Sequence, residues 1–146
     1  MREAGRLVGE VLTELAAHVA PGVTTADLDG LAEKRIRKAG ATPAFKGYHG
    51  YPATICASVN DEVIHGIPSG RRMLNEGDVI SIDVGAELNG YFGDSAVTLA
   101  VGLVSEAAAT LLRVTDESLY KAIDAVKLGG RISEIGRASC RERVWR

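Results

Sequence analysis

The sequence lacks the features of several large classes of protein. Its two cysteines, Cys56 and Cys140, are too few for a disulfide framework and have no recognisable metal-ligand spacing. No apolar run approaches the roughly 20 residues that span a bilayer, and Met1-Arg2-Glu3 lacks the apolar stretch of a secretory signal. With 17 basic and 19 acidic residues, the net charge of −2 gives no case for binding nucleic acid or a membrane surface. We therefore expect a cytoplasmic protein that binds neither.

The chain does contain enough apolar residues for one modest domain, since 46% of it is hydrophobic. Apolar residues recur at helical spacing from Leu7 to Val19, and a second helical pattern begins at Thr24 or Thr25 and ends at Gly40. Alternating patterns predict strands over 54–59, 79–85 and 91–99, and a third helix is expected from about 105 to 126. We expect an α+β fold in which helices flank an antiparallel hairpin sheet.

Two aspartates stand out because they occupy apolar strand patterns. Asn89-Gly90 separates the second and third predicted strands and is a strong hairpin signal. A two-residue loop there would pair Asp83 with Ala96 and place Asp94 diagonal to Asp83 on the same face of the sheet. Two carboxylates aimed at one point repel each other and are costly to desolvate, which a divalent cation would relieve. The spacing leaves two interpretations open, a metal site and two ordinary edge or turn-bonded aspartates.

A Gly- and aromatic-rich loop precedes the first predicted strand. The loop, the hairpin and the segment between them contain Phe45, Gly47-Tyr48-His49-Gly50-Tyr51-Pro52, Cys56, Asn60, Glu62, His65-Gly66-Ile67-Pro68, Ile82-Asp83-Val84, Asn89-Gly90-Tyr91 and Gly93-Asp94. In order and spacing these residues resemble the bacterial-type (type I) methionine aminopeptidases of family M24. The two aspartates match that family's first two metal ligands at the same interval of eleven residues. The resemblance covers residues 1–136, which we interpret as part of a catalytic domain.

The resemblance implies a pita-bread (creatinase/aminopeptidase) fold, of which this chain would be the N-terminal half. It implies that Asp83 and Asp94 bind two divalent ions of the Co, Mn, Fe, Zn or Ni class, which carboxylate oxygens suit. It also implies that His65 is catalytic and contacts the substrate near the scissile bond. The residues that the resemblance implies in substrate binding are Phe45, Tyr48, His49, Tyr51 and Cys56. It also implies a monovalent-cation site, made largely of backbone carbonyls, at Asn60 and Glu62.

The implied function is the metal-dependent removal of N-terminal (initiator) methionine from peptides and nascent proteins. The ribosome is a candidate partner, and the full-length enzyme is expected to be a monomer. The family's other metal ligands, one histidine and two glutamates, lie in its second half, and no histidine follows His65 here. We therefore expect a truncated fragment that carries the first half of the site and has no measurable activity alone. Two alternatives stay open: a catalytically inactive pita-bread binding module and a related Xaa-Pro aminopeptidase-like hydrolase.

A faint internal repeat and the last ten residues lead to two further expectations. Leu128-Gly129 and Glu134-Ile135 repeat the earlier Pro21-Gly22 and Asp27-Leu28, each after a long amphipathic pattern, and with the resemblance this marks a half-fold boundary. Residues 137–146 contain four arginines and no clear helical apolar face. We interpret them as a non-native tail from a cloning junction, frameshift or misassembly, the alternative being a basic tail for an acidic partner.

Overall fold

The computed structural model describes residues 1–140 and divides the chain into two compact units. Unit 1 comprises Met1–Val104 and unit 2 begins at Ser105. The helices and strands are α1 (Arg2–His18), α2 (Thr25–Lys38), β1 (Thr42–Pro43), the 3-10 helix η1 (Tyr48–Gly50), β2 (Ile55–Val59), β3 (Val79–Leu88), β4 (Tyr91–Ala100), α3 (Glu106–Asp124) and α4 (Ile132–Cys140).

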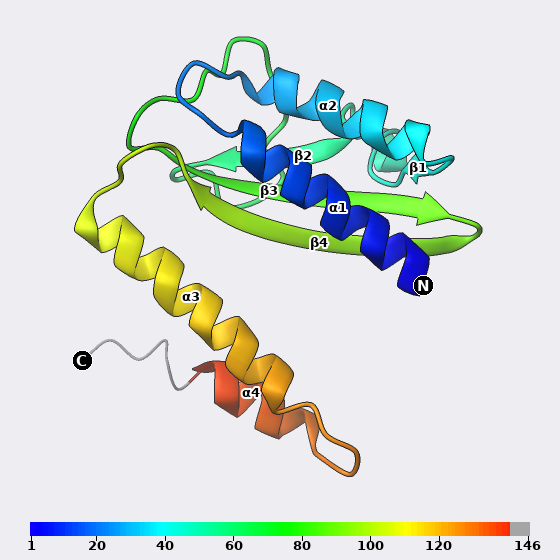
Figure 1. Cartoon of the computed structure of the whole chain (residues 1–146), viewed down its shortest axis with the longest axis vertical. Coiled ribbons are helices and arrows are strands. Elements are labelled where there is room, and N and C mark those ends of the chain that lie inside the picture. The colour runs from blue at the N-terminus through cyan, green and yellow to red at the C-terminus, as the bar shows by residue number, and fades with distance from the viewer. Residues whose placement is uncertain (141–146) are drawn as a thin grey trace. The chain divides into compact units, whose positions relative to one another are not determined.

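Strand β3 is the centre of unit 1 because it pairs along both of its edges. Strand β4 runs antiparallel to it over its whole length. On the other edge, β2 pairs with residues 80–84 of β3 and β1 pairs with residues 86–87, both antiparallel. Helices α1 and α2 lie side by side over one face of this sheet (Figure 1). The sheet therefore has a face that the helices cover and an opposite face that they leave free.

The core of unit 1 lies between the helices and the covered face. Alternate residues of β3 point into it, and Ile80, Ile82 and Val84 are fully buried. Close packing at this face also requires a small residue in β4, since a Cβ on Gly93 would lie 2.6 Å from the backbone of Ala4 in α1. The main core contributions of the two helices are Leu7, Val8, Val11 and Leu15 from α1 and Leu28, Ala32 and Ile36 from α2.

The helix limits follow the expected signals. Thr24 is the N-cap of α2: its hydroxyl accepts a hydrogen bond from the backbone of Asp27, whose carboxylate accepts one from the backbone of Thr24. Gly40 ends this segment with a φ of 74°, a left-handed conformation that glycine adopts without penalty. The predicted cap and the predicted stop are both confirmed.

The hairpin has the predicted register. Leu88 pairs with Tyr91 across a two-residue turn, and Asn89 and Gly90 have φ values of 55° and 78°, as a twist-matched hairpin turn requires. Asp83 pairs with Ala96, and Asp94 pairs with Gly85. The expectation that Asp94 lies diagonal to Asp83 on one face is confirmed.

Strand β1 and helix η1 were not expected from the sequence. Strand β1 has only two residues and includes Pro43, so it shows no alternation and lacks one backbone donor. Helix η1 contains His49 at φ 47° and follows Gly47 at φ 90°. These positive φ values are not helical, so the segment has no regular helical pattern to detect in the sequence. Strand β1 depends on its pairing with β3, whereas η1 is held by backbone hydrogen bonds among residues 45–51.

Unit 2 is a helical pair. Ser105 is the N-cap of α3, where its hydroxyl accepts a hydrogen bond from the backbone of Ala108, and α4 packs on α3. Helix α4 follows α3 across a turn as α2 follows α1, which matches the faint sequence repeat. Residues 137–140, which we assigned to the tail, belong to α4, and 141–146 lie outside the described residues. Within residues 1–140, no helix combines the length and the apolar character needed to cross a membrane.

Candidate metal and peptide site

The free face of the sheet positions the two aspartates. Because side chains alternate along a strand, Asp83 points away from the helices while its neighbours Ile82 and Val84 enter the core. Asp94 lies on the same free face from β4, and Cys56 pairs with Asp83 from β2. The Oδ1 atom of Asp83 is buried and has no hydrogen-bond partner. A buried carboxylate oxygen without a donor is costly, so this atom calls for a ligand.

The electrostatics of the pair point to a cation. Burial raises the pKa of Asp83, and the negative charge of Asp94 and a hydrogen bond with it raise that pKa further. His65 acts in the opposite direction but is the smaller influence. A divalent cation would favour both ionised carboxylates at once, and hard oxygen donors suit such ions. The two residues therefore fit a metal, although residues 1–140 contain no group of three or more His, Cys, Asp or Glu side chains that could complete its shell.

The aspartates open into a cavity of about 540 Å³, a size typical of small-ligand sites. It brings together every predicted catalytic, substrate-binding and metal residue. Gly50, Pro52 and Ile67, for which no role was predicted, also line it. The predicted residues in its lining are Phe45, Tyr48, His49, Tyr51, Cys56, His65, Asp83 and Asp94.

One wall of the cavity is kept neutral. The Tyr51 hydroxyl lies 3.0 Å from the carbonyl oxygen of Ile55 and 3.1 Å from that of Gly66, so it donates to the backbone and does not point a free proton into the cavity. Burial, followed by the neighbouring Cys56, raises the pKa of Tyr51, and burial raises the pKa of the Cys56 thiol. Both groups therefore stay uncharged at neutral pH. A neutral wall with a sulfur atom suits an apolar, polarizable side chain.

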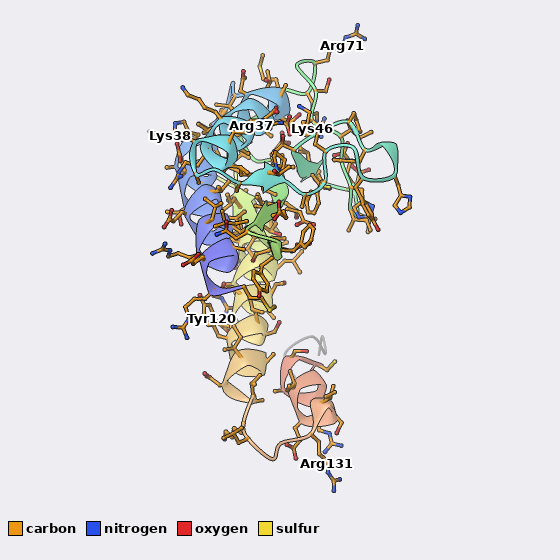
Figure 2. The ribbon with its side chains drawn as sticks, turned by 90° about the vertical axis from the view of Figure 1, so that its right-hand side faces the viewer. Arg37, Lys38, Lys46, Arg71, Tyr120 and Arg131 are labelled. Atoms are coloured by element: carbon orange, nitrogen blue, oxygen red, sulfur yellow. The ribbon has the colours of Figure 1, made fainter. Side chains whose placement is uncertain are left out.

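A second wall depends on a close approach between Phe45 and β3. A Cβ on Gly85 would lie 2.4 Å from the Phe45 ring, so only glycine lets the ring lie against the strand at this point. The next residue, Lys46, pairs with Glu33 of α2 at 2.8 Å, and Arg37 pairs with the same carboxylate. Figure 2 labels the two basic side chains, Lys46 and Arg37. The Lys46–Glu33 pair ties the Phe45 loop to α2, and the Arg37–Glu33 pair lies within α2. Neither the Gly85–Phe45 contact nor the Lys46–Glu33 pair has a local signal in the sequence, because the partners are distant along the chain.

Tyr48 and His49 line the exposed edge of the cavity. Tyr48 is exposed, and its ring packs edge-on against His49 with the centroids 4.3 Å apart. His49 has a φ of 47°, an unusual conformation for a residue with a Cβ. Both line the cavity that contains the aspartates.

Asn60 and Glu62 do not line this cavity. The Asn60 side chain donates to Asp78 at 2.8 Å and accepts from the backbone of Val79 at 2.9 Å. A Glu62 carboxylate oxygen accepts from the backbone of Val59 at 2.8 Å. Both side chains therefore hold the turn after β2, and the expected cation site of backbone carbonyls stays a prediction.

A hairpin carboxylate pair with an unpartnered buried oxygen, in a cavity that a histidine also lines, has the features of a metal-binding site. The sequence profile of metallopeptidase family M24 matches residues 1–145, and the chain belongs to this family. The methionine aminopeptidase of Clostridium acetobutylicum is 56% identical over 138 residues, which is 94% of this chain and 55% of that protein. Methionine aminopeptidase 1 of Bacillus subtilis is 54% identical over the same share of both chains. The resemblance inferred from the sequence is confirmed.

Solved structures agree with the fold expected from the sequence. The methionine aminopeptidase of Rickettsia prowazekii superposes with a TM-score of 0.91 and 38% identity, covering 97% of this chain and 56% of that one. The prolidase of Pyrococcus furiosus, at 21% identity and a TM-score of 0.81, shares the fold. The expected α+β pita-bread fold is confirmed. The chain spans about half the length of the curated relatives it matches.

Proposed function

We propose that the protein removes N-terminal methionine from peptides and nascent proteins, and that this chain carries the first half of the active site. The observation that carries the proposal is the unpartnered, buried Oδ1 of Asp83 beside Asp94 in a cavity that His65 also lines. Membership of a metallopeptidase family and the identity to methionine aminopeptidases support it.

Asp83 and Asp94 would hold divalent metal, and we propose two ions, as the resemblance implies. When bound, the ions would polarise the peptide carbonyl and acidify water. The neutral wall of Tyr51 and Cys56 would receive the methionine side chain, and Phe45 would bound it on the side of β3. His65 would hydrogen-bond the substrate near the scissile bond, where a histidine can donate or accept a proton near neutral pH.

Further expectations belong to the same proposal. A monovalent cation would bind backbone carbonyls near Asn60 and Glu62. Because nascent chains are the proposed substrate, we propose the cytoplasm as the place of action and the ribosome as a candidate partner, with a monomer as the state of the full-length enzyme. We expect the chain alone to show no measurable turnover, because two carboxylates hold a metal weakly and orient water poorly.

A chimera tests the function directly. Residues 1–136 would replace the matching part of the Bacillus subtilis enzyme, and release of methionine from a Met-Ala-Ser peptide would be measured with Mn²⁺ or Co²⁺. We expect metal-dependent release that Asp94→Ala abolishes. Ser81→Ala is the matched control, since Ser81 lies on the same face and its hydroxyl bonds that of Thr98 at 2.9 Å. A folded chimera without turnover would refute the proposal and favour a binding module.

Calorimetry on the same chimera tests the metal assignment. If Asp94 bridges two ions, Asp94→Ala should remove both binding events, whereas Asp83→Ala should weaken mainly one. Unchanged two-site binding in the Asp94→Ala protein would show that other residues hold the metal.

A further inference from the structure

The backbone of His65 has an unusual conformation that something must hold in place. Its φ of 58° lies in the left-handed region, which a residue with a Cβ adopts only when its surroundings fix it. The side chain does not supply this restraint: the residue is exposed, and no side chain within residues 1–140 forms a hydrogen bond with the imidazole. Val63, Ile64 and Ile67, around it, are exposed as well.

The restraint comes from the next residue, which is docked against β2. A Cβ on Gly66 would lie 2.3 Å from the carbonyl oxygen of Ala57 and 2.8 Å from the Cα of Ser58, so the two backbones are in direct contact. The Gly66 carbonyl accepts hydrogen bonds from the backbone of Ala57 at 2.9 Å and from the Tyr51 hydroxyl at 3.1 Å. Its N–H donates to the hydroxyl of Ser58 at 3.0 Å.

Ser58 provides the side-chain part of this docking. It is 5% exposed, in the middle of β2, and its Oγ is the acceptor for the Gly66 N–H. Polar residues this deeply buried in a strand usually serve a specific partner. The nearest anchors of the loop on either side are the Glu62 contact with Val59 and the bonds between Ser69 and Thr25. Gly66 is thus the attachment point of the loop between them.

We propose that Ser58 is a positioning residue for His65: through the Gly66 N–H it fixes the backbone from which the imidazole reaches the cavity. The proposal rests on the proposed function for its catalytic meaning, but the contact itself can be tested without turnover. Loss of the Ser58 hydroxyl would leave the Gly66 N–H without its acceptor, loosen residues 63–67 and let His65 leave the left-handed region.

The test is NMR spectroscopy of the whole 146-residue chain. The chain has three histidines, so its imidazole signals are few, and His65→Asn identifies the one from His65. Two variants remove the acceptor: Ser58→Ala, and Ser58→Cys, which keeps the volume but is a poor acceptor and replaces the alanine variant if that variant does not fold. Ser81→Ala is the matched control, because Ser81 pairs with Ser58 in the sheet but its hydroxyl bonds that of Thr98, whereas the Gly66 N–H donates to Ser58.

We expect amide hydrogen exchange at Gly66 to accelerate at least tenfold in the Ser58 variants, with a shifted or broadened His65 imidazole signal and no such change in the control. Unchanged exchange at Gly66 would overturn the proposal. Faster exchange with an unaltered His65 signal would also overturn it, because Ser58 would then be structural only. Adding Co²⁺ separates the two proposals: if it perturbs no histidine signal, the metal assignment for this chain fails while the result for Ser58 stands.

Discussion

Replacing Asp29 should destabilise unit 1 more than replacing any other carboxylate of α2. One carboxylate oxygen of Asp29 accepts hydrogen bonds from the backbone N–H groups of Thr54 and Ile55, at 2.8 and 2.9 Å. Both residues are completely buried, so Asp29→Ala leaves two donors unsatisfied at the start of β2. At about 1–3 kcal/mol for each unsatisfied donor, and with partial access of water at the half-buried Asp29, the expected loss is about 2–4 kcal/mol.

Two comparisons make this prediction specific. Asp29→Asn keeps an oxygen in place and should lose only the charge-assisted part, about 1 kcal/mol. Asp27→Ala, two positions away on the same helix, removes an exposed cap and should destabilise less than Asp29→Ala. Urea unfolding, followed through the amide signals of β3 so that unit 1 alone is observed, measures all three. Equal effects of the two alanine variants, or of Asp29→Asn and Asp29→Ala, would refute the reasoning.

Three further predictions concern the cavity and the fold. Gly85→Ala should push the Phe45 ring into the cavity, because the new Cβ would lie 2.4 Å from the ring. In the chimera, this variant should raise KM for Met-Ala-Ser more than it lowers kcat. An unchanged KM would show that Phe45 does not bound the substrate. His65→Ala should lower kcat by about 10²–10⁴-fold with a smaller change in KM, measured in the same assay, and near-normal kcat would reduce it to a loop residue. The hydrogen bond from Asn60 holds the pKa of Asp78 below its ordinary 3.8. The ionised Asp78 carboxylate therefore contributes fully to stability above about pH 4, and this contribution is lost as the pH falls through the lower pKa of the folded state. In urea unfolding experiments, the stabilities of wild type and Asp78→Asn should differ at pH 7 and converge at low pH.

The elements that the sequence predicted correctly are those with local signals. Asn89-Gly90 sets the hairpin turn, and Thr24 with Asp27 sets the start of α2, because turn and cap geometry depend on a few adjacent residues. The diagonal placement of the aspartates then follows from strand alternation. The grouping of the loop residues with them did not follow from spacing and came only from the family resemblance.

The contacts that the sequence did not reveal join residues far apart in the chain. Gly85 appears as an ordinary strand glycine until Phe45 is seen against it, and Ser58 as an ordinary strand serine until Gly66 is docked on it. Strand β1 similarly exists only because Ala86 and Glu87 of β3 offer it an edge. Such features have no periodicity, and their physical cause lies in tertiary packing.

The two-residue turn at Asn89-Gly90 has a consequence for how this hairpin can vary in evolution. Because side chains alternate, inserting or deleting one residue between the two aspartates while the strands stay paired would rotate Asp94 from the free face of the sheet to the face under α1, beside Gly93's present contact with Ala4. A single codon would thus both dismantle the carboxylate pair and drive a charge into the helix packing. Surface turns normally tolerate changes in length, but here the turn length sets the position of Asp94, the proposed metal ligand on β4. We therefore expect related sequences to vary the residues of this turn and keep their number.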